Sequence, residues 1–273
     1  MAHSARLFEK NGASVRTLAL AGGPAPVSDL AALGRADLTV LPLPVTRDGV
    51  RPTGAAVEVP PTFAEIFAAL GAGALMFGGA IPPSLLAEAD LAGVRLVDYY
   101  RDEELLRKNA YLTAEAAVAM ATLDLPVSLR GARVAVLGSG RIARALCGIL
   151  HTLGARIEIY ARNPVSLAVL AAHGGEPHLF SDKLPLVLDG RVRAVFATVP
   201  APVLDGTAVA FLAANTPIYD LWGGGVCSEE AKARGFALPD CRALPGRYSP
   251  ESAADALFET RLRRWKKEGG AGL

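Results

Sequence analysis

The stretch VAVLGSGRIARAL, residues 134–146, decides the fold, because an apolar strand here runs through a glycine turn into a helix. A second predicted strand at 156–162 completes a βαβ unit, and in that context the GxGxxA pattern indicates dinucleotide binding. Gly138 permits the tight turn, Gly140 lets a pyrophosphate approach the backbone, and Ala143 allows close packing of the helix on the strand.

The start of this helix is the predicted phosphate site, because the first backbone N–H groups of a helix have no partner within it. Ser139, Arg141 and Ile142 surround the helix start and are predicted to contact the cofactor together with the two glycines. The alternative is an ordinary βαβ turn that binds no ligand.

The residues after the second strand indicate which dinucleotide is bound. NAD-binding domains usually carry an acidic residue there, which bonds the ribose hydroxyls. This chain has Arg162-Asn163 instead. An arginine attracts a 2′-phosphate that an acid would repel, so Arg162 predicts NADP, with Asn163 beside it in the site. The alternative is a solvated surface arginine.

Further cofactor contacts are expected where the next two predicted strands, 193–200 and 216–225, end, because the carboxyl ends of parallel strands line the ligand crevice. The residues concerned are Thr198, Val199, Pro200, Asp220, Leu221 and Trp222. Ordinary strand-end turns are the alternative.

The rest of the chain also alternates strands with helices, which predicts a parallel sheet. The candidate strands are 17–23, 37–45, 74–79 and 94–100, and the candidate helices are 62–70, 84–93, 112–124 and 249–267. Thr113 suits the N-cap of the helix at 112–124.

The predicted fold class is α/β. It has two α/β domains, the second a Rossmann-type doubly wound parallel sheet, with a bridging helix and a C-terminal helix returning to the first domain. The expected boundaries are 1–110 for the N-terminal substrate-side domain, 111–127 for the bridging helix, 128–247 for the NADP-binding domain and 248–273 for the C-terminal helix.

Composition excludes several classes of function. The 28 basic and 27 acidic residues leave a net charge of +1, so no basic excess points to nucleic acid. Cys147, Cys227 and Cys241 form no CxxC pair, and the four histidines show no zinc spacing, so no metal is expected. No apolar run approaches the ~18 residues of a membrane span, and the polar start predicts a cytoplasmic protein.

Several segments together resemble the dipicolinate synthase A-chain family, the family of the catalytic component of that enzyme. They are LTVLPLPVTRDGV (38–50), VRLVDYYRDEELLRKNAYLTAEAAVAMA (94–121), VAVLGSGRIARAL (134–146) with IYARNP (159–164), FATVPAPVLD (196–205), IYDLWGGG (218–225) and ALPGRYSPESAADAL (243–257). The resemblance implies an NADP-dependent oxidoreductase that forms dipicolinate, pyridine-2,6-dicarboxylate, from a dihydrodipicolinate-type intermediate during sporulation. It also implies a place in the mother-cell cytoplasm and a partner, the flavoprotein-like B subunit of dipicolinate synthase.

A dicarboxylate substrate of this kind needs arginine or backbone N–H groups to hold it. Arg247 is the predicted carboxylate anchor. Its expected helpers are Tyr248, Ser249 and Thr113 as hydrogen-bond donors, with Asn109 and Thr46 lining the substrate cleft. The alternative is that Arg247 only shapes the turn and that Ser249 caps the last helix.

No catalytic acid–base pair stands out, so the catalytic residues stay unknown. Two other functions therefore remain open: another two-domain dehydrogenase of a small carboxylic acid, and a protein that binds NADP without turnover. The sequence also leaves the oligomeric state open, a homo-oligomer included.

Overall fold

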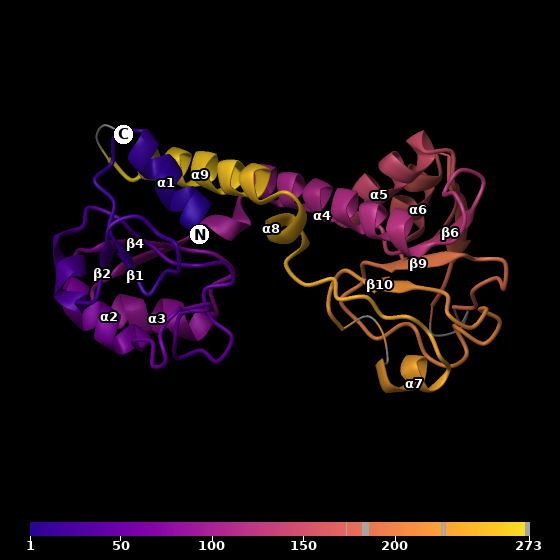
Figure 1. Ribbon diagram of the computed structural model, residues 1–273, viewed down its shortest axis with the longest axis horizontal. Coiled ribbons are helices and arrows are strands. Elements are labelled where there is room, and N and C mark those ends of the chain that lie inside the picture. Colours follow the sequence, from indigo (N-terminus) through magenta and orange to yellow (C-terminus); the bar gives the residue numbers. More distant parts are fainter. Residues whose placement is uncertain (173, 182–185, 225, 227, 271–273) are drawn as a thin grey trace. The chain divides into compact units, whose positions relative to one another are not determined.

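The computed structural model describes residues 1–270 apart from 173, 182–185, 225 and 227, so Cys227 lies outside the described residues. The chain forms two compact units, Met1–Leu106 with Pro250–Leu273, and Arg107–Ser249 (Figure 1). The sheets of both units are parallel. The predicted fold class is therefore confirmed.

The second unit is built on a five-stranded parallel sheet of order β10-β9-β6-β7-β8. The strands are β6 (Arg133–Leu137), β7 (Arg156–Ala161), β8 (Glu176–Leu179), β9 (Ala194–Ala197) and β10 (Ile218–Asp220). The chain runs from the central β6 to one edge and then returns to the other side of β6 at β9. This order is the doubly wound one, and it places the ligand crevice at the carboxyl ends of β6 and β9.

Helices cover one face of this sheet and connecting segments cover the other. α4 (Glu103–Asp124), α5 (Arg141–Thr152) and α6 (Pro164–Ala171) pack on the side chains of Val134, Val136, Ile157 and Ile159. The opposite face, with Ala135 and Leu137, packs against residues between 180 and 212 and against Ala231 of α7 (Ser228–Ala233). A short helix, α8 (Leu244–Tyr248), ends the unit.

The first unit has α-helices on both faces of a three-stranded parallel sheet of order β3-β4-β5. The strands are β3 (Thr39–Val40), β4 (Leu75–Gly78) and β5 (Arg95–Asp98), and a separate parallel pair is formed by β1 (Thr17–Leu18) and β2 (Pro26–Val27). α2 (Phe63–Leu70) and α3 (Pro83–Leu91) cover one face, and α9 (Pro250–Lys267) covers the other. The 3₁₀ helices are η1 (Leu30–Arg35) and η2 (Tyr99–Arg101).

α9 also packs along α1 (Ala2–Lys10), where the rings of Phe258 and Phe8 meet edge to face at 4.9 Å (Figure 1). The C-terminal helix thus returns to the first unit. Sequence reasoning did not predict α1 or β8. It made the first two strands too long. The first ends at Leu18, because Ala19 has a φ of +53°, which is not a strand conformation. The second ends at Val40, because Pro42 and Pro44 lack the backbone donors that a longer ladder would need.

The predicted N-cap of the helix at 112–124 is wrong. α4 begins at Glu103, ten residues before Thr113. Asp102 Oδ1 accepts hydrogen bonds from the N–H groups of Glu104 and Leu105, each at 3.1 Å. Asp102 is therefore the N-cap of α4. Thr113 lies within the helix, where its Oγ1 donates to the carbonyl of Asn109 at 2.7 Å.

Candidate cofactor site

Gly138 occupies the turn where β6 ends beside β9. Its φ of +113° is a backbone conformation that other residues rarely adopt. A side chain there would collide with Thr198 Oγ1 and lie 3.2 Å from Val199 Cγ1. Thr198 in turn donates its Oγ1–H to the carbonyl of Leu137 at 2.7 Å. The fold itself therefore requires glycine at position 138.

Gly140, the N-cap of α5, has no such internal reason to be glycine. Its φ is −78°, which any residue adopts, and a Cβ there would meet nothing within 4 Å among the protein atoms. The first turn of α5 has no side-chain cap and no acidic residue. The helix start is thus open and electropositive, which suits a pyrophosphate that approaches the backbone. Ser139 beside it is half-buried, while Arg141 is exposed and Ile142 half-buried.

The end of β7 is tied to this turn, because the Gly138 N–H donates to the carbonyl of Tyr160 at 2.7 Å. Arg162 follows two residues later. It is exposed, and it makes no hydrogen bond or ion pair with any residue that the structure describes. Asn163 is already engaged, because its Oδ1 accepts the N–H of Ser166 at 2.9 Å and so caps α6. Arg162 is therefore the residue here whose role the protein itself leaves unexplained.

The end of β10 lies beside that of β9, since the Leu221 N–H donates to the carbonyl of Ala197 at 2.9 Å. Asp220 Oδ1 accepts the N–H of Gly223 at 2.9 Å and shapes the turn that follows. Trp222 is 61% exposed. Pro200 is exposed after β9. The structure thus brings the predicted residues of β6, β9 and β10 to one edge of the sheet.

The predicted substrate residues are divided between the two units. Thr46 belongs to the first unit, and the second contains Asn109, Thr113, Arg247, Tyr248 and Ser249. The guanidinium of Arg247 is engaged locally: Nη1 donates to the carbonyl of Asp240 at 2.7 Å. It also lies 3.6 Å from the Asp240 carboxylate. These contacts fix the turn before α8, and Ser249 directly precedes α9.

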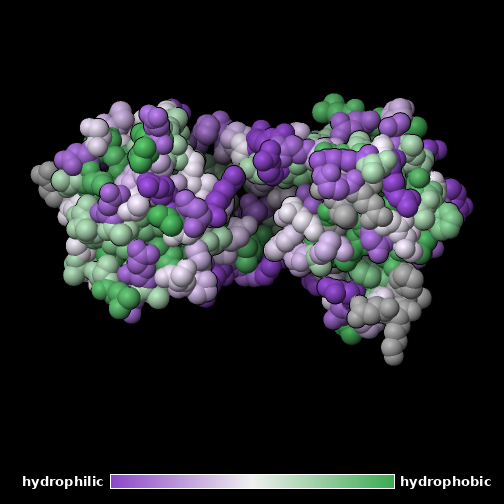
Figure 2. All heavy atoms as spheres, turned by 90° about the horizontal axis from the view of Figure 1, so that it is seen from below, coloured by the Kyte–Doolittle hydropathy of each residue, from purple (hydrophilic) through white to green (hydrophobic). Residues whose placement is uncertain are grey.

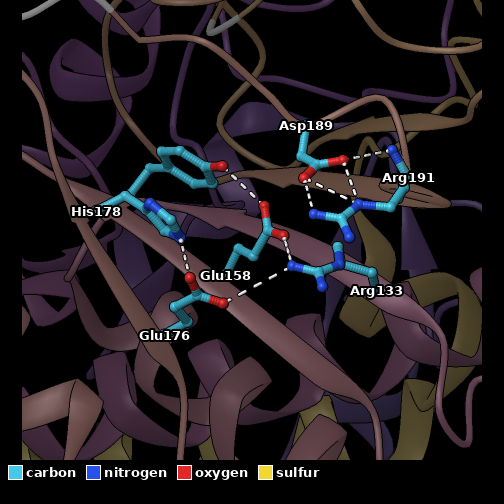
Figure 3. Close-up of polar contacts among 7 residues, drawn as sticks. Arg133, Glu158, Glu176, His178, Asp189 and Arg191 are labelled. Carbon is cyan, nitrogen blue, oxygen red and sulfur yellow. Dashed lines mark hydrogen bonds and ion pairs between the residues drawn. The ribbon is translucent and has the colours of Figure 1, made fainter.

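Sequence reasoning missed a polar cluster on the face of the same sheet that lies opposite α5 (Figure 3). Glu158 is only 2% exposed, and its carboxylate accepts from Arg133 Nη1 at 2.6 Å and from the Tyr160 hydroxyl at 2.8 Å. Burial and this carboxylate raise the pKa of Tyr160. His178 stacks on the Tyr160 ring, and the group borders a hollow of about 580 Å³. The signal was a charged residue inside the apolar strand RIEIYA.

Cysteine and metal chemistry find no support in the described part of the chain. Burial raises the pKa of the Cys147 thiol to about 12. Burial is also the main reason that the pKa of the Cys241 thiol is raised to about 12. Neither thiol is therefore a ready nucleophile. No group of three potential metal ligands occurs among the described residues.

No described helix has the length and apolar character needed to cross a bilayer. Hydrophilic and hydrophobic residues are interspersed on the face seen in Figure 2.

The fold is the one seen in solved two-domain dehydrogenases that have a Rossmann-type nucleotide-binding domain. L-alanine dehydrogenase, for example, superposes with a TM-score of 0.61 at 18% identity, over 97% of this chain and 83% of that one. The A subunit of dipicolinate synthase from Bacillus halodurans superposes with a TM-score of 0.82 at 23% identity, over 96% of this chain and 93% of that one.

The sequence comparison finds a relative of the same name. The A subunit of dipicolinate synthase from Bacillus subtilis is 26% identical over 165 residues, which are 60% of this chain and 55% of the relative. The match thus spans little more than half the length of the curated relative. No protein-family profile matches the chain. The predicted resemblance to the dipicolinate synthase A subunit is confirmed.

Proposed function

We propose that this protein is an NADP-dependent oxidoreductase that forms dipicolinate from a dihydrodipicolinate-type intermediate during sporulation, in the cytoplasm of the mother cell. The observation that carries the proposal is the open backbone at Gly140, next to a glycine turn at the switch point of a doubly wound sheet. The likeness to the A subunit of dipicolinate synthase supports the choice of product. It also supports a partner, the B subunit of that enzyme.

NADP rather than NAD follows from charge. Arg162 is exposed at the end of β7, and no acidic residue follows that strand before α6. A guanidinium can bind a 2′-phosphate through two parallel hydrogen bonds. The backbone at Ser139, Gly140, Arg141 and Ile142 would hold the pyrophosphate. The strand ends at Thr198–Pro200 and Asp220–Trp222 would line the remainder of the cofactor site.

The chemistry proposed asks the protein mainly to position its substrate. The chemistry that bound NADP supplies is acceptance of a hydride from a ring carbon, and a proton leaves the ring to solvent as it becomes aromatic. Because aromaticity drives this proton loss, the step needs no strong general base. Orientation of two bound reactants can by itself supply much of a rate enhancement. The residues of this chain therefore act by binding the carboxylates and the phosphates.

A kinetic assay tests the proposal. The full-length protein is supplied with NADP and hydroxytetrahydrodipicolinate, which gives the dihydrodipicolinate when it loses water. The assay is run with and without the B subunit, and the pyridine product is followed by its ultraviolet absorbance. We expect dipicolinate to form faster than in the protein-free control, and Gly140→Val protein to match that control. If the protein binds NADP but neither mixture exceeds the control, the protein binds the nucleotide without this turnover and the proposal fails.

A further inference from the structure

The carboxyl ends of the three strands in the first unit are held close together around Gly79. The N–H of Val45 donates to the carbonyl of Gly79 at 2.9 Å. A Cβ on Gly79 would lie 2.7 Å from Leu43 and 3.0 Å from the Tyr99 ring. The segments that follow β3 and β5 therefore both contact the residue that follows β4.

Arg47 lies in a hydrogen-bonded loop at this end of the sheet, two residues after Val45. The loop closes on itself, because the Thr53 N–H donates to the carbonyl of Val45 at 3.0 Å. Asp48 Oδ1 accepts from the Thr46 hydroxyl at 3.0 Å and from the N–H groups of Val50 and Arg51 at 2.8 and 2.9 Å.

Those bonds, led by the Arg51 N–H, lower the pKa of Asp48. Its carboxylate is thus committed to the loop backbone. Arg47 itself is exposed and has no hydrogen bond or ion pair within the described chain. The loop therefore presents a guanidinium that the protein does not use.

Arg101 stands in the matching place on the other side, two residues after Tyr99. Its side chain is 72% exposed, and its Nε forms an ion pair with Asp98 at 3.6 Å. Asp98 is mostly engaged elsewhere, since Oδ1 accepts the N–H groups of Tyr100 at 2.9 Å and Ala80 at 3.2 Å. An ion pair this long and exposed leaves the guanidinium available to a ligand.

We propose that Arg47 and Arg101 bind the two carboxylates of the substrate, an inference that rests on the proposed function. β3 and β5 flank β4, so their ends lie about 10 Å apart. Two arginine side chains on the segments that follow these strands are long enough to span this gap with a small dicarboxylate between them. Planar guanidinium groups match carboxylates in geometry and charge. Arg247 is a weaker choice, because its Nη1 already donates to two backbone carbonyls.

Binding measurements test these two anchors. Pyridine-2,6-dicarboxylate and the monocarboxylate pyridine-2-carboxylate are titrated by calorimetry into the full-length protein saturated with NADP. Arg47→Gln and Arg101→Gln are compared with Arg95→Gln, a control at the opposite end of β5 from Arg101. The lysine variants at 47 and 101 keep the charge. Circular dichroism and thermal unfolding of the full-length protein report on whether each variant is folded.

We expect each glutamine variant to bind the dicarboxylate roughly tenfold more weakly, as one lost charge-assisted contact implies. The lysine variants should have dicarboxylate affinities between those of the glutamine variants and the unmutated protein. Arg95→Gln protein should bind the dicarboxylate as tightly as the unmutated protein. The preference for the dicarboxylate over the monocarboxylate should shrink in both glutamine variants. Unchanged dicarboxylate affinity in folded Arg47→Gln and Arg101→Gln proteins would overturn the anchors alone. Absence of dicarboxylate binding to the unmutated protein would overturn the proposed function and the anchors together.

Discussion

Gly138 and Gly140 are two residues apart and are glycine for different reasons. At Gly138 a positive φ and contact with Thr198 exclude a side chain. At Gly140 the protein leaves open space. A substitution at the first position should therefore damage the fold, whereas one at the second should damage only what binds there.

We predict that Gly138→Ala lowers the free energy of unfolding by about 1–2 kcal/mol or more, the cost of a left-handed non-glycine residue. Gly140→Val should leave that free energy nearly unchanged and abolish NADP binding. Chemical denaturation and calorimetry on the two variants measure both quantities. If a folded Gly140→Val protein binds NADP with unchanged affinity, Gly140 does not contact the pyrophosphate.

Arg162 and Asn163 offer a similar contrast for cofactor choice. We predict that the unmutated protein binds NADP roughly tenfold more tightly than NAD, and that Arg162→Asp reverses the order. Asn163→Ala, the neighbouring control, should cost about 1 kcal/mol of stability through the lost α6 cap and leave the preference for NADP. Equal affinities for both cofactors in the unmutated protein would contradict the role given to Arg162.

At the scale of the elements, α9 is held by two arginines in opposite ways. Arg261 is fully buried, donates to the Ser4 and Tyr99 hydroxyls at 2.6 and 2.7 Å, and stacks over the Tyr99 ring. Arg263 is 39% exposed and pairs with Asp102 and Glu104. Arg261 thus joins α9 to α1 and to the end of β5, whereas Arg263 joins α9 to the start of α4.

We predict that Arg261→Ala destabilises the protein by about 3 kcal/mol or more, because it leaves a cavity and unpaired buried hydroxyls. Arg263→Ala, two residues away on the same helix, should cost about 1 kcal/mol or less, as exposed ion pairs do. Denaturant titrations of both variants give the comparison. Similar losses from the two changes would show that Arg261 does not hold the helix as described.

Asp102, which caps α4 and pairs with Arg263 of α9, should make the free energy of unfolding depend on pH. Although desolvation raises its pKa, the Leu105 N–H and the Arg263 charge outweigh that effect and lower it overall. A lowered folded-state pKa means that the stabilisation is present above the ordinary aspartate value and is lost as the pH falls through the folded value. Asparagine at position 102 can still cap the helix but carries no charge. At pH 7 the free energy of unfolding of the Asp102→Asn protein should therefore be lower than that of the unmutated protein. The two values should approach each other as the pH falls below about 4, where the Asp102 carboxylate begins to be protonated. A constant difference from pH 7 to pH 3 would contradict this.

Local patterns predicted the Rossmann unit well because its signals lie close together in the sequence. The elements concerned follow one another in the chain: β6, the glycine turn, α5 and β7. The spacing of apolar residues in each strand and in the helix is the one typical of that element. The start of α4 was missed because the charged run 101–110 carries little apolar periodicity, and Asp102 as its cap could not be told from other acidic residues. Glu158 was missed because its role depends on Arg133, 25 residues earlier in the chain, and no local pattern encodes that contact. Arg247 donates to the nearby carbonyls of Asp240 and Arg242, and its residue type alone does not distinguish such a turn contact from a ligand contact.

For the whole molecule, the proposed cofactor residues all lie within residues 107–249 and the proposed carboxylate anchors within residues 1–106. Each ligand should therefore stabilise a different unit. A ligand at one hundred times its dissociation constant adds about 2.7 kcal/mol to the state that binds it. That is enough to slow hydrogen exchange measurably in the segments it contacts.

We predict that NADP alone slows amide exchange in residues 137–144 and 197–200, and that pyridine-2,6-dicarboxylate slows it in residues 45–50, 79–81 and 98–101. The physical reason is that each ligand orders the backbone that donates to it or carries its arginine. Hydrogen-exchange mass spectrometry of the full-length protein with each ligand separately measures this, and Gly140→Val protein is the control for the NADP pattern. If the dicarboxylate instead protects residues 242–249, Arg247 is the anchor and the loops of the first unit are not. Protection by NADP in residues 45–50 would likewise contradict the division of the two sites between the units.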